Sequence, residues 1–337
     1  MFMIVSMMSA ACALGEEGQS ESANVKETTA QMEERTDANE KKAAEETSKD
    51  DAMRSEEVFD SAKFNELFTV RYFHLQHPSH PGDSILIQTP DGRSMLIDAG
   101  APHVDLQLVR YLQQLGVESI DAVVATHPHS DHIGGFPLVL KAFDIGRFYL
   151  LDIYNDRFYY HDMMKAIERE EVEHEYLEGG MSFKLGDEVT VEVLHPAAGV
   201  LPEAAEDLEE EWMINHFSLV LKVTYKDTTF LFTGDIFSKQ ELELVDAYGE
   251  ELKADFLHVP HHGNASSSSL PFIQTVAPQV AVMGSNIFEI GLVNRYENEG
   301  IDVYLTEMHG NILIISDGEQ LEVMTEKDWQ NPMRRAK

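Results

Sequence analysis

The 337-residue sequence contains a single cysteine, Cys12, so no disulfide can form within the chain. Basic residues are also scarce: 25 Lys and Arg stand against 60 Asp and Glu, and the formal net charge is −35. Such a surface repels nucleic-acid phosphates, and the sequence has no clear nucleic-acid-binding patch of basic and aromatic residues. The apolar run at residues 1–11 is too short for a transmembrane helix. Hydrophobic residues make up 43% of the chain, enough for the core of one large α/β domain or two small ones.

The apolar segment at residues 1–12 ends in small residues followed by Cys12. This resembles the end of a bacterial lipoprotein signal, in which the cysteine becomes the lipid-modified N-terminus. The resemblance implies an extracytoplasmic protein that is held at a membrane only through an N-terminal lipid anchor. A cleaved secretory signal and an uncleaved cytosolic N-terminus remain as alternatives.

A polar segment follows this N-terminus. From Ala13 to Glu57 the chain consists mainly of Glu, Ser, Thr, Ala and Lys and has no aromatic residue. Such a composition buries too little apolar area to offset the entropy cost of ordering the chain. We therefore predict a disordered acidic tether over residues 13–60, which would hold a folded domain at residues 64–330 away from a membrane. A disordered tail without a role is the alternative.

Ten residues, Thr126 to Gly135, read THPHSDHIGG and directly follow the apolar run 120–125, which is typical of a buried strand. Three imidazoles and one carboxylate lie within six positions. These are nitrogen and oxygen ligands that zinc, manganese or iron accept. Burying four such groups without a cation would carry a large desolvation cost. The spacing therefore predicts a metal site in the loop after this strand.

Alternating and helical patterns along the rest of the chain predict an α/β or α+β fold. The pattern predicts strands before helices, twice over, and no repeat with a period of 20–50 residues. Expected strands lie at 70–73, 84–88, 94–98, 189–194, 218–224, 229–233, 256–259, 280–283, 301–305 and 312–315, and expected helices at 106–115, 137–143, 162–173, 238–247, 267–276 and 291–300. The acidic stretch 201–211 is expected to be a loop or a surface helix.

The spacing of the histidine-rich loop resembles the HxHxDH signature of the metallo-β-lactamase superfamily. The resemblance implies an αββα four-layer sandwich and two divalent metal ions, with zinc expected and manganese as the alternative. It places His127 and His129 on metal one, and Asp131 and His132 on metal two. Two such ions activate a shared water as a hydroxide nucleophile near neutral pH.

Other matches to this superfamily lie at strand ends. Asp235, after Gly234, would bridge both metals, and its alternative role is to cap the helix that begins near Ser238. In the segment His261-His262-Gly263, His262 would complete metal two. His261 would be a proton donor or phosphate contact and, with Asp131, would take part in catalysis. Asp98 would orient the metal loop through hydrogen bonds.

The third protein ligand of metal one has no clear match. His195 ends the strand 189–194, and His216 precedes the hairpin that leads to Gly234. Either side chain could reach the site, and the third possibility is that neither does.

The order of the motifs, which include Gly82-Asp83-Ser84, resembles the metallo-hydrolase domain of ComEC competence proteins over residues 70–318. Secreted bacterial phosphorylcholine esterases share a similar site. By this analogy the expected function is hydrolysis of phosphodiesters, and other esters are possible substrates. A lactonase, thioesterase or β-lactamase activity is the enzymatic alternative, and a non-catalytic binding module on the same fold is the other.

Overall fold

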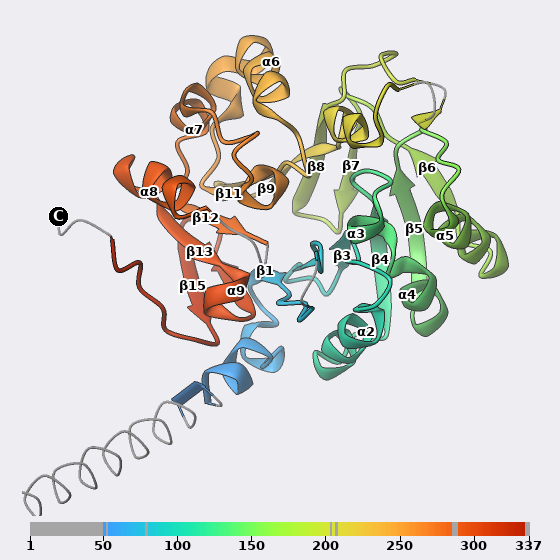
Figure 1. The fold of residues 1–337 in the computed structure, drawn as a ribbon. Helices are drawn as coiled ribbons and strands as arrows, with labels where there is room; N and C mark the ends of the chain where they lie inside the picture. Colours follow the sequence, from blue (N-terminus) through green and yellow to red (C-terminus); the bar gives the residue numbers. More distant parts are fainter. Residues whose placement is uncertain are drawn as a thin grey trace, which may run out of the picture. The chain divides into compact units, whose positions relative to one another are not determined.

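Two mixed β-sheets face each other and carry helices on their outer sides (Figure 1). The computed structural model describes residues 50–51, 53–77, 80–202, 204–205, 208–284 and 289–333. Residues from 52 onward belong to one unit. The first sheet has the strand order β15-β14-β1-β2-β3-β4-β5-β6, and the second has the order β13-β12-β11-β10-β9-β8-β7.

The first sheet takes strands from both halves of the sequence, whereas all strands of the second come from its second half. The first sheet contains β1 (Phe68–Tyr72), β2 (Ile85–Gln88), β3 (Ser94–Ile97), β4 (Ser119–Val124), β5 (Asp144–Leu150), β6 (His174–Tyr176), β14 (Ile312–Ser316) and β15 (Leu321–Thr325). The second contains β7 (Ser182–Leu185), β8 (Val189–His195), β9 (Val220–Tyr225), β10 (Thr228–Phe232), β11 (Phe256–His258), β12 (Val280–Met283) and β13 (Asp302–Leu305).

Helices connect and cover the sheets. They are η1 (Ala62–Phe64), α2 (Asp105–Gln114), α3 (Ser130–Ile133), α4 (Phe136–Ala142), α5 (Phe158–Arg169), η3 (Glu211–Phe217), α6 (Ser238–Tyr248), η4 (Gly249–Leu252), η5 (Pro260–Gly263), α7 (Leu270–Val276), α8 (Ile290–Asn298) and α9 (Thr306–His309). Within the described ranges, none has the length and hydropathy that crossing a bilayer requires.

Apolar side chains alternate between two interior layers along the strands, as the pleat of a strand dictates. On β4, Val123 packs with α2, α4 and α5, whereas Val124 points between the sheets. On β10, Phe230 points between the sheets and Leu231 packs with α6, α7 and α8. These contacts confirm the predicted αββα four-layer sandwich.

The N-terminal boundary of the domain differs from the prediction. Residues 53–58 are helical, and Val58 and Phe59 are buried in the core beneath α2. Arg71 Nε donates a hydrogen bond to the Val58 carbonyl at 3.2 Å. Burial of each such side chain contributes about 1.5–3 kcal/mol to the docking of this turn. The tether therefore cannot extend to residue 60. Its part before residue 50, the signal-like segment 1–12 and Cys12 lie outside the described residues.

Some strands were not predicted. β5 contains Gly146 and Arg147, and β15 lies at a sheet edge with half-exposed side chains, so neither shows a continuous apolar or alternating pattern. The acidic stretch ends in η3, a 3-10 helix whose tight turn has no 3.6-residue signature.

The fold positions the site through strand ends. β3, β4 and β5 are parallel, and so are β10, β11 and β12. Loops that leave the carboxyl ends of parallel strands emerge at one edge. The Leu219 N–H donates to the Thr126 carbonyl at 2.9 Å, which joins the edges of the two sheets beside the histidine-rich loop.

Candidate metal centre

Asp98 holds the histidine-rich loop in place at the end of β4. Its carboxylate accepts hydrogen bonds from the Thr126 N–H at 2.8 Å and the Thr126 hydroxyl at 2.7 Å. The same carboxylate accepts from His132 Nδ1 at 2.8 Å. Behind the loop, a Cβ on Gly135 would lie 2.1 Å from the Ala99 carbonyl oxygen, so only glycine fits there. Through Thr126 and His132, Asp98 therefore holds the residue just before the six-residue metal motif and the last residue of the motif.

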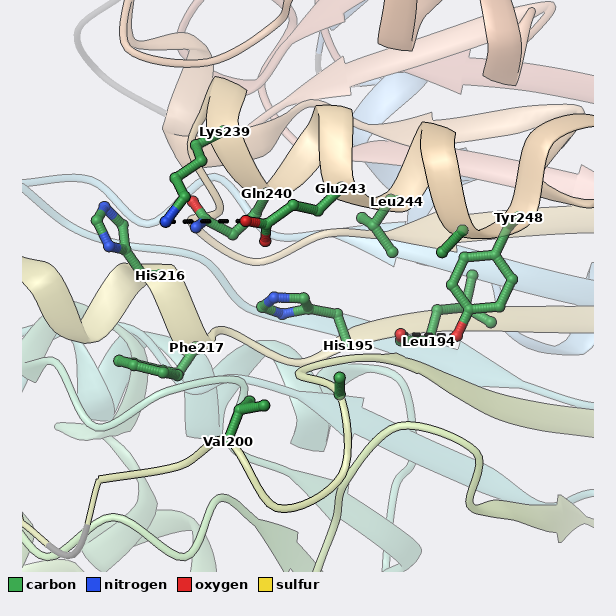
Figure 2. Close-up of a pocket in the computed structure, with 12 residues that line it drawn as sticks. Leu194, His195, Val200, His216, Phe217, Lys239, Gln240, Glu243, Leu244 and Tyr248 are labelled. Carbon is green, nitrogen blue, oxygen red and sulfur yellow. Dashed lines mark hydrogen bonds and ion pairs between the residues drawn. The ribbon is translucent and has the colours of Figure 1, made fainter.

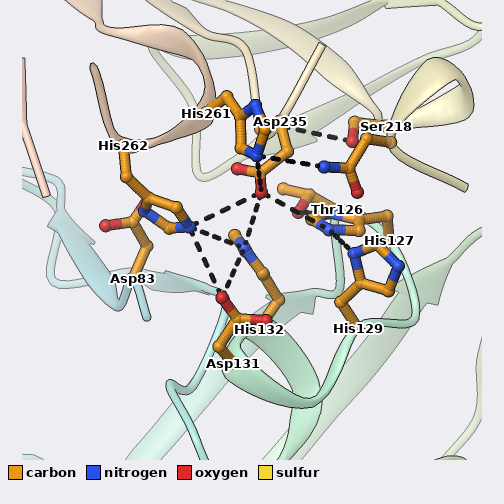
Figure 3. A network of polar contacts seen from close by, with 12 residues as sticks. Asp83, Thr126, His127, His129, Asp131, His132, Ser218, Asp235, His261 and His262 are labelled. Atoms are coloured by element: carbon orange, nitrogen blue, oxygen red, sulfur yellow. Dashed lines mark hydrogen bonds and ion pairs between the residues drawn. The ribbon is translucent and has the colours of Figure 1, made fainter. Parts of the chain in front are cut away.

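Asp235, which follows β10, lies at the centre of the site (Figure 3). Its Oδ2 atom is 3.8 Å from His127 Nε2 and 3.4 Å from His132 Nε2. The same oxygen is 3.9 Å from His261 Nε2 and 3.5 Å from His262 Nε2. One carboxylate oxygen thus faces four imidazoles from two loops.

Hydrogen bonds fix which nitrogen of three imidazoles faces the centre. His132 Nδ1 donates to Asp98, and His262 Nδ1 donates to the Gly284 carbonyl at 2.8 Å. His127 Nδ1 lies 3.1 Å from the Thr126 hydroxyl, whose proton goes to Asp98. In each neutral ring the Nε2 lone pair is then directed at the centre, as in metal-ligating histidines.

Two pairs of nitrogen lone pairs face each other. His132 Nε2 and His262 Nε2 are 3.2 Å apart. His129 Nε2 donates to the Glu211 carbonyl at 3.2 Å, which leaves its Nδ1 lone pair 3.0 Å from His127 Nε2. Neutral lone pairs at this distance repel unless a cation lies between them. Tetrahedral zinc, with Zn–N bonds of about 2.0–2.1 Å, spaces two nitrogens by about 3.3 Å.

Asp131 and Asp83 complete the side of the site around His262. Asp131 Oδ2 lies 3.6 Å from His262 Nε2, and Asp83 Oδ2 lies 3.2 Å from His262 Nδ1. Asp83 also accepts from His258 Nε2 at 2.9 Å. His261 and His262 both have positive φ, 52° and 53°, a region that costs non-glycine residues about 1–2 kcal/mol each. Such strain concentrates at functional sites.

The electrostatics of the cluster indicate missing positive charge. Burial would lower the pKa of His132, but the carboxylates of Asp235 and Asp98 raise it well above 6.5. Burial also opposes charge on His262, whose pKa Asp235 and Asp83 raise in the same way. For Asp235, burial would raise the pKa, but His262 and His132 hold it well below its ordinary range. The buried carboxylates thus attract positive charge to the place where the imidazole nitrogens converge, and a metal ion would supply that charge.

The donor set fits divalent cations. Three groups of side chains have ligand atoms within 4.8 Å of one another: His127, His132 and Asp235; Asp131, His132 and His262; and Asp83, Asp235 and His262. Asp235 Oδ1 is buried and has no hydrogen-bond partner among the described residues. An orphaned carboxylate oxygen beside facing nitrogen lone pairs matches the needs of a metal ion.

The two alternatives for a third ligand of metal one lie elsewhere (Figure 2). His195 Nδ1 donates to the Ser218 carbonyl at 3.0 Å and its ring lines a cavity of about 340 Å³ beside α6. His216 lines the same cavity and packs against Trp212 and Phe237. Neither joins the described groups of potential metal ligands.

Sequence reasoning assigned no role to Asp83 or Asn215. The motif Gly82-Asp83-Ser84 was visible as part of a family resemblance and was the available signal for Asp83. Asn215, buried on η3, places its Nδ2 3.4 Å from His261 Nε2, and its Oδ1 has no partner among the described residues. No local pattern distinguishes Asn215 from any other loop asparagine.

The chain is similar in sequence to two curated proteins. The chain is 28% identical over 234 residues to ComE operon protein 3 of Bacillus subtilis, covering 64% of this chain and 28% of that protein. It is 28% identical over 236 residues to competence protein ComA of Neisseria gonorrhoeae, covering 68% and 30%. The chain thus spans less than a third of the length of these relatives.

Among solved structures, the metallo-beta-lactamase fold protein YhfI from Bacillus subtilis aligns with 15% identity and a TM-score of 0.47, covering 71% of this chain and 96% of that one. The family model described as Metallo-beta-lactamase superfamily matches residues 77–283. That span contains the histidine-rich loop, Asp235 and His262, and on this basis the chain belongs to the metallo-β-lactamase superfamily.

Proposed function

We propose that this chain is a metal-dependent hydrolase that cleaves phosphodiesters at a centre with two divalent metal ions. The observation that carries the proposal is the facing of nitrogen lone pairs, 3.0 Å apart for His127 and His129 and 3.2 Å apart for His132 and His262. Asp235 Oδ2 lies close to both pairs. The two pairs and the shared carboxylate form two cation sites with one common ligand.

The residues divide into two donor sets. His127, His129 and Asp235 would hold one ion, and Asp131, His132 and His262 would hold the other together with Asp235. Imidazole and carboxylate ligands favour zinc, with manganese as the alternative. Ions held here would polarise a phosphoryl oxygen and lower the pKa of a coordinated water toward neutrality.

The protein's own groups position the reaction. His261 is the more exposed of the two histidines on η5 beside Asp235, and its Nδ1 lies 2.8 Å from the Ser266 hydroxyl, which fixes the ring. We assign it contact with the substrate and proton donation to the leaving group. Asp131 is also partly exposed, with 23% of its side chain accessible. Asp98 and Asp83 hold the ligating imidazoles in orientation.

The charge of the metal centre and of the chain supports phosphodiesters as the substrate class. A dinuclear cation site suits an anionic diester, because both ions stabilise the negative charge that develops. One relative is a competence protein by name, but the chain spans less than a third of its length, so the proposal does not extend to competence. The net charge of −35 also disfavours a polymeric DNA substrate and favours small or membrane-borne phosphodiesters.

The test combines metal content with turnover. Purified full-length protein should contain divalent metal and should hydrolyse bis-p-nitrophenyl phosphate when zinc or manganese is supplied. His129→Ala should abolish turnover while the far-UV circular dichroism spectrum stays unchanged. His174→Ala, an exposed histidine on β6, is the matched control and should retain full activity.

Two outcomes would redirect the proposal. Efficient hydrolysis of lactones, thioesters or β-lactams without diester turnover would favour the acyl-hydrolase alternative. Full metal loading without turnover of any of these classes would favour a non-catalytic binding module. Absence of bound metal and of any preference for an added divalent ion would refute the metal centre itself.

We also propose that the protein is an extracytoplasmic lipoprotein anchored through Cys12. The support is the apolar segment that precedes this single cysteine. Labelling of cells with a radioactive or clickable fatty acid should mark the protein, and Cys12→Ser should abolish the label and release the domain from the membrane fraction. Membrane association that persists in the Cys12→Ser variant would contradict a lipid anchor.

A further inference from the structure

A cluster of aromatic rings leads from the metal centre to the surface. Trp212 on η3 contacts Phe237, with ring centroids 5.6 Å apart, and Phe237 contacts His261 at 4.9 Å. His216 packs edge-on against both Trp212 and Phe237, at 5.6 Å and 5.0 Å. Because Phe237 contacts both rings, the Trp212 ring centroid lies within about 11 Å of the His261 ring centroid.

Trp212 is the exposed end of this cluster. Half of its surface, 51%, is accessible to solvent, although tryptophan is among the residues that gain most from burial. Single exposed apolar residues are common, so exposure alone is not evidence of a site. Here the exposed ring is the outer member of a contiguous set that ends at a proposed catalytic side chain.

The helix that carries Trp212 is held on both sides. The Glu211 carboxylate accepts a hydrogen bond from the Tyr159 hydroxyl at 2.8 Å and is paired with Arg157. The Glu211 carbonyl accepts from His129. On the other side, Ile214 and Asn215 are buried. The tryptophan is therefore presented on a fixed element rather than on a free loop, which lowers the entropy cost of binding a ligand.

Taking the phosphodiesterase function as the premise, we propose that Trp212, with Phe237 and His216, forms a subsite that stacks a flat aromatic group of the substrate, such as a nucleobase, beside the metal centre. An exposed aromatic ring offers a surface on which a nucleobase stacks, whereas a cation gains most when an aromatic cage excludes water. The acidic residues Glu209 and Glu210 precede η3 and oppose a polyanionic strand. The favoured ligand is thus a small nucleotide-like diester.

The binding test needs no turnover. Trp212 and Trp329 are the two tryptophans of the chain, so Trp329→Phe leaves Trp212 as the only source of tryptophan fluorescence. Adenosine 5′-monophosphate and ribose 5-phosphate share the phosphate and sugar but differ in the base. Added to the zinc-loaded variant, the nucleotide should quench the emission with at least about fivefold higher affinity, the lower range for base stacking on an aromatic side chain.

Inhibition of bis-p-nitrophenyl phosphate hydrolysis provides the second measurement. Trp212→Ala should remove the preference for the nucleotide over ribose 5-phosphate, and Trp212→Phe should restore most of it. Tyr176→Ala, another exposed aromatic at a sheet edge, is the matched control and should keep the preference.

Three results would overturn the subsite. Equal affinities for the two phosphates would show that the base is not contacted. Tighter binding of phosphocholine than of the nucleotide would assign the rings to a cation instead. An unchanged preference in Trp212→Ala would place the base elsewhere. A protein that quenches as expected but hydrolyses no diester would refute the phosphodiesterase function and leave the ring-binding site standing.

Discussion

Histidines gather in two neighbouring regions of the domain, and the two regions differ in what surrounds the rings. Around Asp235, buried carboxylates raise the pKa of His132 and His262 well above 6.5. In the cavity beside α6, burial lowers the pKa of His195, which bonds only to a backbone carbonyl. Burial also lowers the pKa of His127 and His261 beside Asp235, so the two regions differ in the buried carboxylates around the rings and not in one common pKa direction.

Removal of the shared carboxylate should have the largest effect. Asp235→Ala takes away the one oxygen near both pairs of facing imidazoles, so both cation sites lose a ligand. We expect kcat/KM on bis-p-nitrophenyl phosphate to fall by at least about 1,000-fold, since several kcal/mol of charge stabilisation are lost. Metal content should fall in parallel. Wild-type activity in this variant would contradict the central role of Asp235.

Chelation should destabilise the protein more at high pH than near pH 6. In metal-free protein, His132 and His262 have raised pKa values, so their protonation adds stability below about 6.5, which is lost as the pH rises through their folded-state values. Asp235 has a lowered pKa, so its contribution is present above about 4 and is lost in acid.

The corresponding measurement is the fall in melting temperature caused by a chelator at pH 6 and at pH 9. The metal-loaded protein should lose little stability between these values, because the metal ions replace the protons. A chelator effect that is equal at both pH values would argue against protons and metal competing for the same imidazoles.

Weakening the hydrogen bonds that orient the ligating imidazoles should have an intermediate effect, a moderate loss of metal affinity. Asp98→Asn keeps the shape of the side chain but weakens the hydrogen bond from His132 Nδ1. Loss of such outer support commonly costs about 10–100-fold in metal affinity, and we expect the same range here. Competition with a fluorescent zinc chelator measures it. Asp83→Asn should behave similarly through His262, and an affinity unchanged in both would mean that the imidazoles are fixed by packing alone.

The smallest effect is expected in the cavity region. His195→Gln should change zinc affinity by less than about twofold, because its Nδ1 bonds to the Ser218 carbonyl and its ring lines the cavity beside α6. Loss of its bond to the Ser218 carbonyl should cost about 1 kcal/mol of unfolding free energy, measured by urea denaturation. A large loss of bound metal in this variant would return His195 to the ligand set of metal one.

Most residues of the site could be predicted from the sequence, because neighbouring residues mark them. His127, His129, Asp131 and His132 lie within one loop, so the covalent chain itself places them together. Asp235 and His262 follow strands and stand next to glycines, which marks them as loop residues at a sheet edge. The structure brings His127, Asp131, His132, Asp235 and His262 into overlapping groups of potential metal ligands. His129 lies beside these groups, with its Nδ1 3.0 Å from His127 Nε2.

Other residues could not be predicted because their roles depend on contacts far along the sequence. Asp83 meets His262 only because the loop before β2 passes the end of β12, where a Cβ on Gly284 would lie 1.8 Å from its carboxylate. Trp212 and Asn215 lie on a 3-10 helix that has no periodic pattern. The docking of Val58 likewise depends on an outer sheet face that the local sequence does not show.

The sequence by itself determined the chemistry of the donors: which imidazoles and carboxylates exist, and which follow strands, since both are properties of neighbouring residues. Tertiary structure alone decided which histidines share a carboxylate oxygen and which line a cavity. The physical reason is distance along the chain. His132 and His262 are 130 residues apart, and only the packing of two sheets brings their nitrogens to 3.2 Å.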